Sequence, residues 1–114
     1  MTMTSAQRSL AERIRISIAD EPIQREVSMF GGRSFMVNEK MIVSAGKDGS
    51  LLVRVAAEDH DRLLLEQPGA EQAEMGTGRT MGPGWITVAA DHLVDEASLA
   101  LWLSCALDYN RAPR

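Results

Sequence analysis

The chain has 114 residues, of which 45% are hydrophobic and 25% charged, and its 16 acidic and 12 basic side chains give a net charge of −4. One hydrophobic core suffices at this length, so we expect a single domain over residues 1–114. No apolar run approaches the roughly 20 residues that cross a bilayer. Cys105 is the single cysteine, which excludes an intrachain disulfide and the usual Cys and His metal motifs. We expect a cytoplasmic protein without membrane contact, metal or cofactor.

The basic side chains are spread along the chain and interleaved with acids. Only two lysines occur, Lys40 and Lys47, and residues 56–78 carry six acids against Arg62 alone. Binding to a phosphate backbone relies on clustered lysine and arginine side chains that release counterions. We therefore expect no direct binding of nucleic acid.

Residues 5–19 predict an amphipathic helix, which Thr4 or Ser5 can cap and which ends before Pro22. Ile16 lies off its apolar stripe and needs a second contact or stays exposed. The stripe recurs every four residues at Ala6, Leu10, Ile14 and Ile18, with Ala11 beside it.

Three runs with a period of two follow, at residues 33–37, 41–45 and 51–55, and they predict an antiparallel meander. In the second run Met41, Val43 and Ala45 should share one face. Asp48-Gly49 predicts a two-residue hairpin turn, because both positions tolerate a positive φ. The other connection, Asn38-Glu39, is either equally short or longer, since glutamate disfavours a positive φ.

The second half predicts a helix at residues 57–67, strands at 71–75 and 85–89, and a helix at 96–109 capped by Asp95. Leu101 lies nearly opposite the apolar face of that last helix. The resulting order, α, three β, α, two β, α, predicts a two-layer α+β fold with helices against one face of an antiparallel sheet. The expected apolar face of the last helix comprises Leu99, Trp102, Leu103 and Ala106, with Leu107 or Tyr109.

No constellation of side chains predicts catalysis. The glycine-rich loop at residues 76–84 lacks the P-loop pattern and precedes a strand, so a flexible connection is the favoured interpretation. Adjacent residues point in different directions, so His60 and His92, each beside aspartate, are interpreted as surface histidines. Cys105 has no neighbouring base and is interpreted as a half-buried small hydrophobe. We expect no catalytic, cofactor-binding or metal-binding residue.

Candidate contacts for a partner or ligand lie in and beside the glycine-rich loop, at Arg79, Met81 and Trp85, because side chains on loops often bind. By period, Trp85 and Trp102 are nevertheless expected in the core. The methionines in or beside strands are interpreted chiefly as core filler, with a groove for a partner as the alternative. They are Met29, Met36, Met41, Met75 and Met81.

Residues 27–32, Val-Ser-Met-Phe-Gly-Gly, resemble an element of the TfoX N-terminal domain family, named for a bacterial competence regulator also called Sxy. A second element, Gly-Arg-Thr-Met at residues 78–81 followed by Gly84-Trp85, resembles that family's Gly-Arg-Pro-Met and Gly-Trp. The resemblance covers about residues 23–110. Glu39 replaces the family's usual glycine after asparagine, and Thr80 replaces its usual proline.

The resemblance implies a fold like that of secretion chaperones and no catalytic residues. The two-domain regulator resembles this chain only in its first half, so its DNA-linked role does not transfer whole. We expect a non-enzymatic, cytoplasmic interaction or regulatory module that acts through an unknown protein partner, with a link to transcriptional or competence regulation. The alternative is a small ligand-binding protein or enzyme with its site at residues 76–84. Ile16 and Leu101 are candidate contacts of a weak homodimer.

Overall fold

The computed structural model describes residues 3–21, 24–29, 31–75 and 78–112. Six strands form one antiparallel sheet in the order β1-β2-β3-β4-β6-β5. In chain order the helices and strands are α1 (Ser5–Ser17), β1 (Gln24–Met29), β2 (Gly32–Val37), β3 (Lys40–Ala45), β4 (Leu51–Arg54), the short 3₁₀ helix η1 (Ala57–Asp59), α2 (His60–Glu66), β5 (Ala70–Gln72), β6 (Trp85–Val88), η2 (Ala90–His92) and α3 (Glu96–Arg111).

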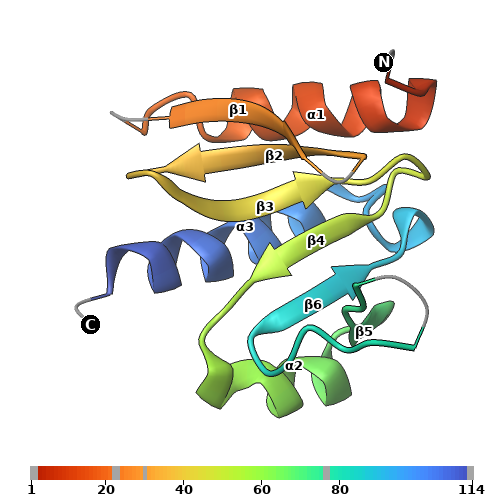
Figure 1. The fold of residues 1–114 in the computed structure, drawn as a ribbon, viewed down its shortest axis with the longest axis vertical. Helices are drawn as coiled ribbons and strands as arrows, with labels where there is room; N and C mark the ends of the chain where they lie inside the picture. The colour runs from red at the N-terminus through yellow and green to blue at the C-terminus, as the bar shows by residue number, and fades with distance from the viewer. Residues whose placement is uncertain (1–2, 22–23, 30, 76–77, 113–114) are drawn as a thin grey trace.

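The long helices lie against one face of the sheet, as the α+β prediction requires (Figure 1). α3 packs on β3 and β4, α1 runs along the side of β1 to β3, and α2 lies beside β5 and β6. None of the helices in the described ranges is long and apolar enough to cross a bilayer. The largest fully buried side chains between the layers include Trp102, Phe35, Ile14, Ile18, Ile42, Leu51, Ile86, Leu93 and Leu99.

The first strand, β1, was not predicted, and the expected order was wrong in that respect. Four strands, not three, separate α1 from α2. The segment Gln-Arg-Glu-Val-Ser-Met has only two apolar residues, Val27 and Met29, since β1 is an edge strand with no fully buried side chain. Pairing of its backbone with β2, and not burial, makes it a strand.

The start of α1 differs in one contact from the expected stripe. Thr4 caps the helix, accepting a hydrogen bond from the Gln7 backbone N–H at 3.1 Å. Ala6 is exposed and Gln7 is buried instead, because the Gln7 amide donates to the carbonyls of Gly31 and Ala45, each at 3.0 Å. This side chain therefore joins α1 to two strand ends. α3 begins after Asp95 as expected, with its predicted apolar face buried.

Of the two forms left open for the Asn38-Glu39 connection, the two-residue turn is the one that forms, whereas the two-residue turn expected at Asp48-Gly49 was wrong. Asn38 and Glu39, with φ of 54° and 63°, form the two-residue turn between paired Val37 and Lys40. The second connection is longer than predicted: its backbone closes between Gly46 and Ser50 at 2.8 Å. The Asp48 carboxylate accepts the Ser50 N–H at 3.0 Å and stabilises this longer loop. Gly49 has the expected positive φ, 83°.

Candidate binding groove

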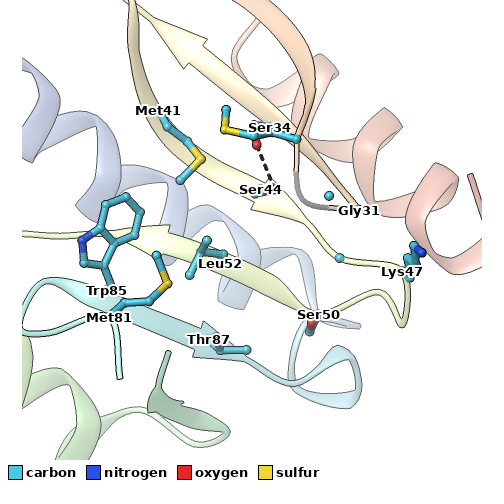
Figure 2. Close-up of a pocket in the computed structure, with 13 residues that line it drawn as sticks. Gly31, Ser34, Met41, Ser44, Lys47, Ser50, Leu52, Met81, Trp85 and Thr87 are labelled. Carbon is cyan, nitrogen blue, oxygen red and sulfur yellow. Dashed lines mark hydrogen bonds between the residues drawn. The ribbon is translucent and has the colours of Figure 1, made fainter. Parts of the chain in front are cut away.

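The face of the sheet opposite the helices carries an open groove of about 670 Å³ (Figure 2). It crosses β2, β3, β4 and β6, and the segment before β6 contributes to its wall. Of the described side chains that line it, most are apolar or hydroxyl-bearing, and one is charged. The lining consists of Met29, Gly31, Gly32, Ser34, Met41, Ser44, Gly46, Lys47, Ser50, Leu52, Met81, Trp85 and Thr87.

Strand alternation places most of this lining. Leu52 lies between buried Leu51 and Val53, and Thr87 lies between buried Ile86 and Val88, so each faces away from the core. A different signal places Met41, which was expected to share a face with Val43 and Ala45. The pairing of β2 with β3 shifts between Phe35 and Met36, opposite Ile42. This bulge turns Met41 into the groove, so the expected shared face was wrong.

The groove has two chemically different ends (Figure 2). Met41, Leu52, Met81 and Trp85 gather at one end, whereas Lys47 lies at the other end beside Gly31 and Ser50. Between them the buried Ser34 hydroxyl donates to the Ser44 hydroxyl at 3.1 Å, so these two polar groups satisfy one another. The surface therefore passes from apolar and polarizable to polar and cationic along its length.

An arginine between two rings fixes Trp85 at the apolar end. The Arg54 guanidinium carbon lies 4.9 Å from the centre of the Trp85 ring and 4.8 Å from that of Tyr109 on α3. Its Nη2 donates to the Tyr109 hydroxyl at 2.8 Å. Gly84 has a φ of 95°, and a Cβ there would lie 2.9 Å from the Val55 carbonyl oxygen and 2.3 Å from Arg54 Nη1, so glycine is required there. The indole is thus held against α3 through Arg54.

Buried His60 supports the segment that carries Met81 and Trp85. Its side chain is 4% exposed, so its interpretation as a surface histidine was wrong. Nδ1 accepts the Gly84 backbone N–H at 2.9 Å, which leaves Nε2 to donate to Gln72 Oε1 at 2.8 Å. The Gln72 amide donates in turn to the Gly82 carbonyl at 3.1 Å. The network ties α2 and β5 to this segment.

The three candidate contacts separate in the structure. Met81 and Trp85 come together in the groove, but Arg79 does not line it. Arg79 is exposed, and its carbonyl accepts the Met75 N–H at 2.7 Å next to a bridge between Glu74 and Thr80. Residues 76 and 77 of the glycine-rich loop lie outside the described residues.

The favoured interpretation of the methionines as core filler was wrong. Met29, Met41 and Met81 line the groove, Met75 is 58% exposed, and Met36 is partly exposed. The same holds for Trp85, which is partly exposed in the groove, whereas Trp102 lies in the core as expected. Sequence reasoning also missed Lys47, Leu52 and Thr87. Strand alternation could have predicted Leu52 and Thr87, because each lies between two buried residues and so faces away from the core.

The remaining candidates lie away from the groove. Ile16 is 77% exposed on α1 and Leu101 is 37% exposed on α3. Cys105 packs half-buried against the core, and this burial raises the pKa of its thiol. His92 is exposed on η2. Within the described ranges, no three His, Cys, Asp or Glu side chains gather in a way that could hold a metal ion.

Comparison with known proteins bears on the identity of the chain. The family model described as the TfoX N-terminal domain matches residues 22–109, which include the described strands and the residues that line the groove. A search of curated proteins found no match. A match of this extent, over a chain with the expected α+β architecture, decides the family. The chain belongs to the TfoX N-terminal domain family.

Proposed function

We propose that the protein is a non-enzymatic binding module whose open groove receives the apolar side chains of a partner protein. The observation that carries the proposal is the gathering of Met41 and Met81 with Leu52 and Trp85 on a sheet face that none of the described helices covers. Methionine is flexible and polarizable, and surfaces that accept several apolar shapes are rich in it. A concave patch of this kind is a candidate interaction site.

The chemistry of the lining supports binding without catalysis. Among the described residues that line the groove, none is an acid, a histidine or a cysteine. The hydroxyls of Ser34 and Ser44 therefore have no general base beside them in the groove. The Ser44 hydroxyl already accepts from Ser34, so neither is presented as a nucleophile.

The backbone of the sheet favours a helical partner segment. β2, β3, β4 and β6 each pair on both sides, so these four strands offer no free edge to a peptide in the groove. An extended peptide would find few backbone partners on this face, whereas a helix satisfies its own backbone and presents apolar side chains. The likeness to secretion chaperones implied by the family resemblance agrees with a role in holding a partner.

We infer a cytoplasmic, regulatory role in transcription or competence through that partner, since the family is named for a competence regulator. With a net charge of −4, the protein itself should not bind DNA more tightly than the weak non-specific range of about 10⁻⁴ M at physiological salt. Fluorescence anisotropy with labelled duplex DNA checks this expectation. A micromolar affinity that falls steeply with salt would place DNA among the direct partners.

A matched pair of variants tests the groove as the partner site. Leu52→Glu places a charge at the apolar end, while Leu65→Glu places the same charge on α2, at a side chain that is 88% exposed. Proteins captured from the native host by the wild type should be retained by Leu65→Glu and lost with Leu52→Glu. Circular dichroism establishes that both variants fold. A partner captured equally by all three proteins does not use the groove, and the proposal fails.

A second candidate function is the binding of a small molecule in the same groove. The alternative expected from the sequence was a ligand-binding protein or enzyme with its site at residues 76–84, and of that loop Met81 lines the groove. Small-molecule binding is favoured by the volume of about 670 Å³, which lies in the range of small-molecule sites, and by the position of Met81 and Trp85. Native mass spectrometry of the purified protein separates the two functions. A bound small molecule of defined mass, displaced by Leu52→Glu, would favour this candidate.

A further inference from the structure

We propose that the groove selects a partner segment that carries a carboxylate beside its apolar side chains, with the carboxylate bound at Lys47. The inference rests on the proposed function and specifies the chemistry of the partner. It follows from the polarity of the groove, which is apolar around Leu52 and Trp85 and cationic at its opposite end (Figure 2).

The position of the Lys47 side chain makes it part of the groove. A Cβ built on Gly31 would lie 3.2 Å from Lys47 Cε and 3.6 Å from Nζ, so the lysine side chain lies directly over that glycine. The Gln7 amide holds the Gly31 carbonyl at 3.0 Å and fixes the backbone beneath the lysine. Gly31 has a φ of 79°, a conformation that glycine adopts without strain. The ammonium group therefore stands over a defined backbone at the groove's end.

The charge of Lys47 is not neutralised within the described part of the chain. Lys47 takes part in none of the ion pairs formed there. The adjacent Asp48 carboxylate turns to Ser50 instead, accepting its N–H at 3.0 Å and its hydroxyl at 2.6 Å. Among the described residues, Lys47 is also the one charged side chain that lines the groove. An anion that enters this end of the groove would meet the Lys47 ammonium, while the nearby Asp48 carboxylate is engaged by Ser50.

The two ends together define the occupant. Apolar side chains would pack on the methionines and Trp85, and one carboxylate would reach the ammonium of Lys47, which fixes the direction in which the segment lies. An ion pair at an exposed site contributes modestly, up to about fivefold in affinity. Lys47 thus acts in orientation and selectivity, and the apolar end supplies most of the binding.

Two fluorescent probes of matched shape test the anion site. 1-Anilinonaphthalene-8-sulfonate carries an anionic group, and N-phenyl-1-naphthylamine is the same ring system without it. Dissociation constants of both probes are measured for the wild type, Lys47→Met and Lys40→Met. Lys40 is the matched control, because it is the other lysine and lines a neighbouring hollow beyond Trp85, not the groove.

We expect Lys47→Met to weaken the anionic probe about threefold to fivefold, to leave the neutral probe unchanged, and to lose this effect at high salt. Lys40→Met should change neither constant. Equal changes in both lysine variants, or none, overturn the anion site while leaving the groove intact. Failure of both probes to bind, with no effect of Leu52→Glu, overturns the proposed function as well. A long-chain carboxylic acid found bound to the purified protein by native mass spectrometry would overturn the protein segment as the occupant.

Discussion

Glu39 has a backbone conformation that residues other than glycine and asparagine rarely adopt. Its φ is 63°, and together with Asn38 it forms the tight turn between β2 and β3. Its carboxylate forms an ion pair with Arg25 at 2.6 Å, but both side chains are more than half exposed, so this pair contributes little. The backbone strain is therefore the larger effect.

Replacing Glu39 with glycine should raise the free energy of unfolding by about 1 kcal/mol, because the left-handed conformation costs roughly 1–2 kcal/mol for a residue with a Cβ. Urea denaturation measures the change. Glu39→Ala is the control, since it removes the ion pair and keeps the strain. If glycine and alanine have the same effect, the turn stores no strain.

Gly49 combines a positive φ with close packing. Its φ is 83°, and a Cβ at this position would lie 3.1 Å from the Ala6 Cβ on α1. Gly49→Ala should therefore lower the free energy of unfolding by about 2 kcal/mol. Gly78 has a φ of 76°, and a Cβ there would meet no atom of the described residues within 4 Å. Gly78→Ala should therefore lower the free energy of unfolding by about 1 kcal/mol, through backbone strain alone. Equal costs in denaturant melts would show that contact with α1 adds nothing.

The turns illustrate what residue types alone could predict. A glycine at a positive φ was correctly expected at position 49, since its residue type signals the conformation. The length of the Asn38-Glu39 turn was left open, because glutamate disfavours the positive φ that Glu39 adopts between its paired strands, and the two-residue turn expected at Asp48-Gly49 was wrong. Likewise, nothing in the residue type of Lys47 distinguishes it from Lys40. Only the fold places one of them over the groove.

At the scale of elements, Glu26 on β1 joins α1 to the sheet. Its carboxylate accepts hydrogen bonds from Arg15 on α1 at 2.8 Å and from Arg33 on β2 at 3.0 Å. The hydrogen bond from Arg15 is the largest cause that lowers the pKa of Glu26 below its ordinary value of 4.5, and that from Arg33 adds to it. The edge strand is thereby held by ionised side chains on both sides.

Because the pKa of Glu26 is lower in the folded protein, its stabilising contribution is complete above pH 4.5 and is lost as the pH falls through the folded value. Glu26→Gln should therefore be less stable than the wild type at pH 7, and the difference should shrink in acid. Thermal unfolding of both proteins between pH 7 and pH 3 measures it. A constant difference across this range would exclude ionisation of Glu26 as the cause.

The elements with strong periodicity were predictable, and those without it were not. α1, α3 and three of the first four strands follow apolar repeats, whereas β1 is a strand only because β2 pairs with it. The residues that line the groove divide in the same way, into those that follow a sequence period and those that do not. Leu52 and Thr87 could be placed opposite the core by alternation, but Met41 reaches the groove through a bulge that its sequence does not signal.

At the scale of the molecule, the homodimer remains a prediction. Ile16 and Leu101 lie on two different helices, 77% and 37% exposed, so either can bury apolar area against a second copy. We expect a weak dimer that Ile16→Glu or Leu101→Glu dissociates. Sedimentation velocity over a range of concentrations measures this. Identical behaviour of the wild type and both variants would remove these residues from any interface.

The hydrogen bond from Gln7 to Gly31 shows that the folded unit extends beyond the segment that matches the family model. The match begins at residue 22, after α1 has ended, yet α1 supplies Leu10, Ile14 and Ile18 to the core and holds the cationic end of the groove through Gln7. An excised segment that started at the family boundary would keep α3 on the sheet, but it would expose the core residues that α1 covers and release the backbone beneath Lys47. The segment that matches the family model, residues 22–109, is therefore shorter than the segment that forms the groove, because the groove also needs α1.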